Sequence, residues 1–168
     1  MKNILASIIL ALVMVSCSSL PSITNDKSVL IIPIKNEKKD FSSYYVYYRL
    51  YYTRDNYDGD IGKKYFTVKP KNDMIIIKDI EPGSYDIYGI EPVYIESGKI
   101  FTQTRLILNF NCLPNEITIL NKTFEISFIK SSSGKFSQHA EFIDTTNEKI
   151  ESIKFDLNKD KNIKTWKY

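Results

Sequence analysis

The chain has few of the residues that most often carry out catalysis or hold metals. Among its 168 residues there is one histidine, His139, and there are two cysteines, Cys17 and Cys112. A zinc site needs three or four His, Cys or carboxylate ligands, so the supply is short. A Cys112–His139 nucleophilic pair has no local pattern to support it, and the sequence contains no phosphate-loop or nucleophile-elbow motif. We therefore predict no enzymatic activity, no cofactor and no metal site.

Long hydrophobic runs are also scarce, and the longest lies at the N-terminus. Residues 4–15 are apolar apart from Ser7 and follow the basic Lys2. The run is too short to span a bilayer comfortably, but it has the length of the hydrophobic region of a signal peptide. Cys17 follows the run and is itself followed by a polar segment. An ordinary secretory signal with an incidental cysteine and an uncleaved anchor are the alternatives.

This segment resembles the lipobox of bacterial lipoproteins in a relaxed form, because Ser16 precedes Cys17 and Met14 stands where Leu is usual. The resemblance implies that residues 1–16 are a signal peptide and that Cys17 carries a diacylglycerol and an N-acyl chain such as palmitate. Several acyl chains anchor a protein stably to a membrane. The resemblance also implies a cell-envelope protein with its domain outside the cytoplasm. Ser18, directly after the cysteine, is similar to the signal that sorts lipoproteins of enteric bacteria to the outer membrane.

The remainder of the chain divides into three segments. Residues 17–27 contain several loop-forming residues and are expected to form a tether that lets the domain stand off the membrane. Residues 28–158 have the length of one domain. Residues 159–168 form a basic tail, which we expect to be loosely held, although Ile163 and Trp166 could dock.

The charge is neither large nor of one sign. Lys and Arg number 23 and Asp and Glu number 20, which gives a formal net charge of +3 with mixed signs along the chain. A nucleic-acid surface would show a basic stripe, so we predict no nucleic-acid partner. With Cys17 acylated, Cys112 has no partner for an internal disulfide, and its apolar neighbours Phe110 and Leu113 predict that it is buried.

Patterns typical of β-strands fill the middle of the chain. About nine short runs with alternating apolar residues follow one another at spacings of roughly 8–15 residues, separated by turn residues. Strands and helices do not alternate, which argues against a parallel α/β fold. We predict an all-β fold, an antiparallel β-sandwich with one C-terminal helix. The predicted core contains Ile80, Tyr85, Ile87, Leu106, Leu108, Phe124, Ile126 and Phe128.

Two local features refine this fold. Pro33 in the first strand lacks a backbone donor, which predicts an edge strand or a strand end. The helix begins with a capping box in which Thr145 is the N-cap and Glu148 the third helical residue. Its apolar stripe, spaced for one helix face, consists of Ile150, Ile153 and Leu157.

Residues 75–90 read as a hairpin, in which Pro82 and Gly83 fit the central positions of a type II turn. The apolar strand, the Pro-Gly turn and the following aromatic strand resemble the pattern of carboxypeptidase-regulatory-like and transthyretin-like sandwich domains. The resemblance covers about fifteen residues and implies a non-catalytic accessory domain. It transfers no functional residues to this chain.

Residues 44–53 form a strand with many aromatic residues. Its aliphatic residues share one face, which we expect to point into the core. The opposite face is predicted to bind a partner, an envelope protein or a glycan, because Tyr and Arg are enriched at recognition surfaces. The alternative is that this face packs under a loop or the helix. The candidate binding residues are Tyr45, Tyr47, Arg49 and Tyr51.

Two functional hypotheses remain open. The first is a membrane-anchored envelope lipoprotein with a binding or structural role. The second is a hydrolase of cell-envelope material that uses acids in the loop over residues 55–60. The loop resembles a calcium site only superficially, because Arg54 and Tyr65 stand where an EF-hand needs acids.

Overall fold

The computed structural model describes residues 20–23, 26–36, 47–55, 64–69, 72–93, 103–130, 132 and 136–168. Within these ranges, nine strands are followed by one α-helix and a short 3-10 helix, so the predicted all-β class with a C-terminal helix is confirmed. The elements are β1 (Ser28–Asn36), β2 (Tyr47–Arg54), β3 (Tyr65–Val68), β4 (Met74–Ile80), β5 (Gly83–Val93), β6 (Gln103–Cys112), β7 (Ile117–Ile119), β8 (Lys122–Lys130), β9 (Phe136–Asp144), α2 (Asn147–Leu157) and η2 (Ile163–Thr165).

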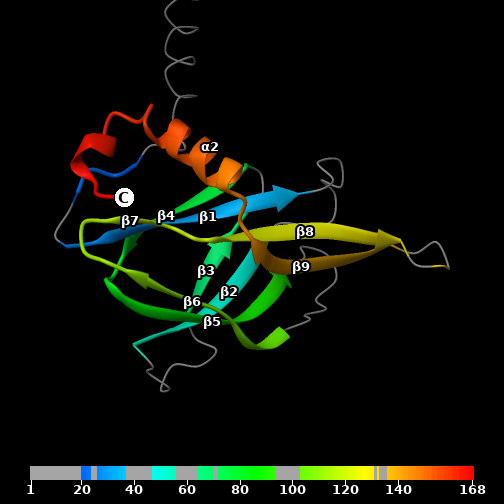
Figure 1. Cartoon of the computed structure of the whole chain (residues 1–168). Coiled ribbons are helices and arrows are strands. Elements are labelled where there is room, and N and C mark those ends of the chain that lie inside the picture. Colours follow the sequence, from blue (N-terminus) through cyan, green and yellow to red (C-terminus); the bar gives the residue numbers. More distant parts are fainter. Residues whose placement is uncertain are drawn as a thin grey trace, which may run out of the picture.

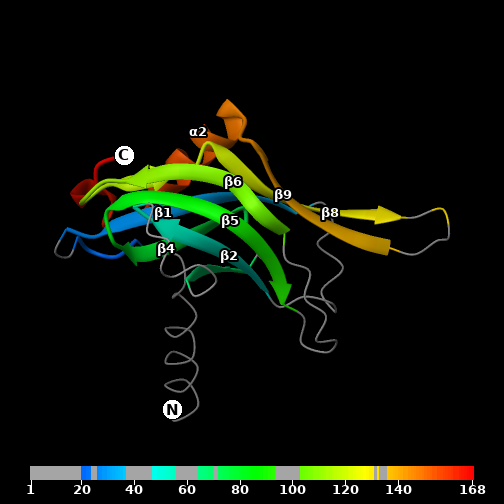
Figure 2. The same cartoon turned by 90° about the horizontal axis from the view of Figure 1, so that it is seen from below.

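The strands form two sheets, which lie one above the other in Figure 1. The five-stranded sheet has the order β4-β1-β8-β9, and β7 also pairs with β1. The four-stranded sheet has the order β3-β2-β5-β6, and all its pairings are antiparallel. β7 and β8 run parallel to β1, whereas β4 runs antiparallel to it. β8 and β9 extend to one side of the molecule as a two-stranded ribbon (Figure 2).

The main hydrophobic core draws side chains from both sheets. Leu30 and Ile32 of β1 belong to the same buried cluster as Tyr48 and Leu50 of β2. The side chains of Leu106 and Phe128 lie outside the described part of the structure. The other six predicted core residues are buried, namely Ile80, Tyr85, Ile87, Leu108, Phe124 and Ile126.

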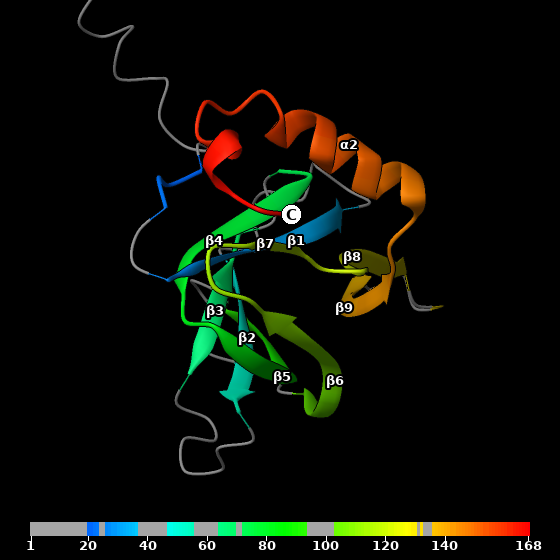
Figure 3. The same ribbon diagram turned by 60° about the vertical axis from the view of Figure 1, so that its left-hand side comes forward.

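β1 is buried on both faces, which explains its nearly unbroken apolar sequence. Leu30 and Ile32 face the main core, whereas Val29 and Ile31 belong to a second cluster. The second cluster also contains residues of α2, of η2 and of the N-terminal segment. The described chain therefore forms three layers, with α2 above the five-stranded sheet and the four-stranded sheet below it (Figure 3).

The prediction that Pro33 marks an edge strand or a strand end is wrong, because β1 has partners on both sides and continues to Asn36. Ile34 donates its N–H to the Asp73 carbonyl on the β4 side. Neighbouring residues of a strand direct their N–H groups to opposite sides, so Pro33 faces the other side. There the partner changes from β7, opposite residues 29–31, to β8, opposite residues 34–36. A missing donor is tolerated at this break in the ladder.

The predicted hairpin over residues 75–90 is also wrong. β4 and β5 both form, but β4 pairs with β1 in one sheet and β5 pairs with β2 and β6 in the other. The Pro82–Gly83 segment is therefore a connection between the two sheets. Gly83 has a φ of +152°, and a Cβ atom there would lie 2.8 Å from Asp55 Oδ1. The glycine is required by this conformation and by this close approach.

The helix forms where it was predicted, but its cap is shifted by one residue. Thr146 is the N-cap, and its side chain accepts a hydrogen bond from the Lys149 N–H. Thr145, the predicted cap, instead contacts Thr123 of β8 through its hydroxyl, at 3.0 Å. In the predicted stripe Ile153 and Leu157 are buried, and Ile150 is half-buried. No helix within the described ranges has the length and apolarity needed to cross a membrane.

The expectation of a loosely held tail is wrong, and the alternative that Ile163 and Trp166 dock is confirmed, because both are buried against the outer side of the five-stranded sheet. The expectation of a free tether over residues 17–27 is wrong for Leu20, which is 1% exposed and belongs to the same cluster. Both segments are short, and each is stabilised by contact with the other. Cys17 lies outside the described residues.

Candidate binding face on the four-stranded sheet

β2 is an inner strand of the four-stranded sheet, and its side chains alternate between the two faces of that sheet. Tyr48 and Leu50 are buried in the main core, as the alternation predicts. Tyr47, Arg49 and Tyr51 are half-buried on the opposite face. Three of the four predicted binding residues therefore lie together. Tyr45 lies outside the described residues.

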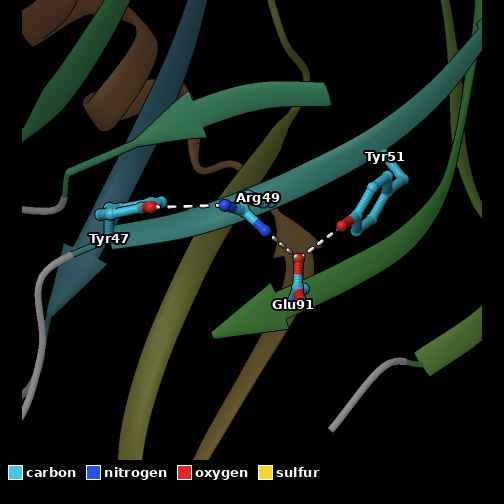
Figure 4. A network of polar contacts seen from close by, with 4 residues as sticks. All are labelled: Tyr47, Arg49, Tyr51 and Glu91. Atoms are coloured by element: carbon cyan, nitrogen blue, oxygen red, sulfur yellow. Dashed lines mark hydrogen bonds and ion pairs between the residues drawn. The ribbon is translucent and has the colours of Figure 1, made fainter. Parts of the chain in front are cut away.

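Glu91 of β5 holds these side chains in one arrangement (Figure 4). It stands opposite Arg49 in the antiparallel register, and Arg49 Nη1 donates to Glu91 Oε2 at 3.2 Å. The Tyr51 hydroxyl donates to the same oxygen at 2.5 Å, and Arg49 Nη2 lies 3.5 Å from the Tyr47 hydroxyl. The Glu91 carboxylate thus holds both Arg49 and Tyr51. Arg49 in turn contacts the Tyr47 hydroxyl.

Two aromatic rings lie close to the guanidinium group. The Arg49 Cζ atom lies 4.9 Å from the centre of the Tyr65 ring and 5.8 Å from that of Tyr47, both within the range of a cation–π interaction. The Tyr51 ring meets the Tyr65 ring edge to face at 5.7 Å and lies 6.3 Å from the Tyr88 ring. We call this set, namely Tyr47, Arg49, Tyr51, Tyr65, Tyr88 and Glu91, the tyrosine–arginine face.

The hydrogen bonds in this cluster keep the Tyr51 hydroxyl neutral and the Arg49 guanidinium protonated. Burial raises the pKa of the Tyr51 hydroxyl, and its hydrogen bond to Glu91 raises that pKa further, so the group stays a neutral donor. Partial burial lowers the pKa of Arg49, but hydrogen bonds to Tyr51 and Glu91 outweigh this effect and raise it above the usual range. The Glu91 side chain is 4% exposed, and its Oε2 lies 3.2 Å from Arg49 Nη1.

The face presents both apolar ring surface and polar tips. The Tyr65 residue is 43% exposed, and the Arg49 side chain is 29% exposed. Of the predicted binding residues, Tyr47, Arg49 and Tyr51 are each half-buried, so part of each side chain remains in contact with water. Tyrosine rings and a partly exposed guanidinium can stack on flat or apolar groups and can donate hydrogen bonds to a partner.

The acidic loop proposed for a hydrolase is described only at its first residue. Asp55 has a φ of 56° and accepts a hydrogen bond from the Ser84 N–H at 2.9 Å. Its other carboxylate oxygen lies 3.3 Å from Arg54 Nε. The side chain thus supports the connection between the sheets. In the described part of the chain, no three His, Cys, Asp or Glu side chains gather as metal ligands would.

Sequence reasoning missed Glu91, Tyr65 and Tyr88 as members of the face. Glu91 precedes Pro92, and its importance depends on the register that places it opposite Arg49. Tyr65 joins the face because β3 pairs with β2 and places it opposite Tyr51. Alternation within β2 was visible in the sequence, whereas these cross-strand neighbours were not.

No protein-family model, no curated protein and no solved structure matches the chain.

Proposed function

We propose that the chain is a non-enzymatic lipoprotein of a bacterial cell envelope, a β-sandwich domain anchored to the membrane through acylated Cys17. The domain binds an envelope component, a protein or a glycan, through its tyrosine–arginine face. The anchor is supported by the signal-like run over residues 4–15 and the cysteine that follows it. The β-sandwich is supported by two sheets that share one core.

The observation that carries the binding role is the fixed position of Arg49. A flexible arginine loses side-chain entropy when it binds, and pre-ordering reduces that loss. Here Glu91 and two aromatic rings hold the guanidinium group before any partner arrives. The carboxylate is engaged with Arg49 and Tyr51, so the arrangement favours recognition over acid–base chemistry.

The binding role is tested by removing ring surface while leaving the buried ion pair intact. Tyr47→Ala with Tyr65→Ala removes two rings of the face and keeps Arg49 and Glu91. The expected result is loss of the envelope partners recovered by chemical crosslinking, with the chain still folded by circular dichroism. The matched control is His139→Ala with Glu141→Ala, an exposed aromatic and charged pair on β9 of the other sheet. Equal recovery in both variants would show that the face does not bind.

The anchor is tested separately. Cys17→Ala should abolish incorporation of a radioactive fatty acid and release the chain from the membrane fraction, because the acylated atom is gone. Cys112→Ala is the control for thiol specificity and should change neither result. Labelling that persists in Cys17→Ala would rule out the lipid anchor.

A further inference from the structure

The N-terminal segment is clamped to the C-terminal segment immediately after the predicted anchor. The Leu20 N–H donates to the Asp160 carboxylate at 2.6 Å, and the Asn162 amide donates to the Leu20 carbonyl at 2.6 Å. The indole N–H of Trp166 donates to the Pro21 carbonyl at 2.8 Å. The Leu20 side chain is buried in the second hydrophobic cluster. The chain is therefore fixed to the domain at Leu20 and Pro21.

The distance available between the anchor and this clamp is small. Leu20 is the third residue after Cys17, and a fully extended chain covers at most about 3.6 Å per residue. Leu20 can thus lie no more than about 11 Å from the acylated residue, only a few ångström beyond the headgroup layer, which is about 5–8 Å thick on each side of the bilayer. A domain held on so short a connection cannot stand off the membrane.

We propose that the segment over residues 154–168 lies against the phospholipid headgroups. The molecule is then oriented with its helix layer, namely α2 and the segment that follows it, on the membrane. This inference rests on the proposed lipid anchor. It specifies which surface of the domain faces the bilayer. The exposed residues of this segment include Asp156, Asn158 and Thr165, and we call its exposed aromatic and basic residues the C-terminal surface: Phe155, Lys159, Lys161, Lys164, Lys167 and Tyr168.

The chemistry of the C-terminal surface suits an anionic lipid interface. Residues 154–168 contain five lysines and two aspartates, a local charge of 5 − 2 = +3. Phe155 is 65% exposed, and the Lys159 ammonium group lies 4.2 Å from the centre of its ring. Aromatic rings and long basic side chains favour the boundary between headgroups and acyl chains. Basic residues near acyl chains add electrostatic attraction to anionic lipids.

The orientation has a consequence for the binding face. The helix layer and the four-stranded sheet lie on opposite sides of the five-stranded sheet (Figure 3). With the helix layer on the membrane, the tyrosine–arginine face points away from the lipid. A partner at that face would belong to the compartment beyond the membrane surface.

The test uses the full acylated chain reconstituted in vesicles of phosphatidylethanolamine and phosphatidylglycerol. A fluorophore whose emission depends on polarity is attached to Phe155→Cys in one sample and to Thr67→Cys in another. Thr67 is an exposed residue of β3 in the four-stranded sheet. Cys112 stays in both samples because it is 1% exposed and should not be labelled in the folded chain. Lipids with a nitroxide near the headgroup serve as quenchers.

The expected result is strong quenching and blue-shifted emission at position 155, with neither effect at position 67. Equal accessibility of both labels to aqueous iodide, in chains that sediment with the vesicles, would overturn the orientation and leave the anchor intact. Stronger lipid quenching at position 67 would overturn it as well. Chains that fail to sediment would refute the lipid anchor and the orientation that depends on it.

Discussion

Arg49 and Glu91 stand opposite each other across β2 and β5, with Arg49 Nη1 lying 3.2 Å from Glu91 Oε2. The two partners differ in their contact with water, because the Arg49 side chain is 29% exposed and that of Glu91 only 4%. An unpaired charge is far more unfavourable when it is buried than when it is exposed. The consequences of removing the cation and of neutralising the carboxylate should therefore differ.

Arg49→Met should lower the free energy of unfolding by about 3–5 kcal/mol, the range for a buried ion pair that loses one partner. The reason is that the Glu91 carboxylate is then buried without a compensating charge. Urea unfolding of a chain that begins at residue 18, which retains every described residue, measures the change. Adding Glu91→Gln to Arg49→Met should recover most of the loss, because the buried charge is gone. An equal loss in the double variant would contradict this account.

The candidate site shows where sequence reasoning succeeds and where it stops. The alternation in β2 identified Tyr47, Arg49 and Tyr51 as one face, because side chains two residues apart must point the same way. The partner that fixes them, Glu91, lies 42 positions from Arg49 in the chain. Its place is set by the pairing of β2 with β5, and no local pattern encodes that register.

Phe124→Ala should lower the free energy of unfolding by about 3–5 kcal/mol. Phe124 is fully buried, and its ring lies 5.1 Å from that of Tyr48 and 5.2 Å from that of Phe142. Truncation leaves a cavity where the two sheets meet. Phe155→Ala is the matched control, since that ring is 65% exposed, and it should change the free energy by no more than about 0.5 kcal/mol. Similar losses in both variants would contradict the assigned core.

Cys112 should be inert toward thiol reagents in the folded chain. It is 1% exposed, and burial raises its pKa to about 11, although a hydrogen bond with Thr118 lowers the pKa slightly. The reactive thiolate is therefore scarce at pH 8. A coloured disulfide reagent should modify Cys112 only after denaturant is added, and fast reaction without denaturant would contradict its burial. The predicted burial of Cys112 is confirmed.

The raised pKa of Cys112 makes the free energy of unfolding depend on pH in the alkaline range. The unfolded thiol loses its proton near its ordinary value of about 8.5, whereas the folded thiol keeps it up to about 11. Between these values the unfolded state binds fewer protons, so stability falls as pH rises, by up to about 1.4 kcal/mol per pH unit. Cys112→Ala should flatten this decline in urea midpoints measured from pH 8 to pH 11. An unchanged slope would assign the decline to other groups.

The fold was predictable at the level of elements and less so at the level of pairing. The run from Val29 to Ile34 and the alternation around Ile87 identified buried strands, because each pattern follows from which faces are covered. Pro82 and Gly83 indicated a turn, but a turn does not determine whether its two strands pair. Here β4 and β5 separate into different sheets, and their partners come from distant parts of the chain.

The contact between the two ends of the chain gives the last prediction. Trp166 is 6% exposed and donates its indole N–H to the Pro21 carbonyl, while Leu20 donates its own N–H to Asp160. Trp166→Phe keeps an aromatic ring in the cluster but removes that donor, which should lower the free energy of unfolding by about 1 kcal/mol. The loss should be local, because the contact joins two short segments outside the main core.

Hydrogen exchange at the Leu20 amide measures this local loss. In Trp166→Phe the Leu20 amide should exchange faster, whereas amides of β5 should be unaffected, since the two-sheet core is intact. Tyr168→Phe is the matched control: it removes an exposed hydrogen bond from the Tyr168 hydroxyl to Asn158, and it should leave the Leu20 amide protected. An unchanged Leu20 amide in Trp166→Phe would mean that the indole hydrogen bond does not hold the N-terminal segment. Leu20 would then be held by its hydrogen bonds with Asp160 and Asn162 without a contribution from Trp166, and the short connection to Cys17 would keep its length.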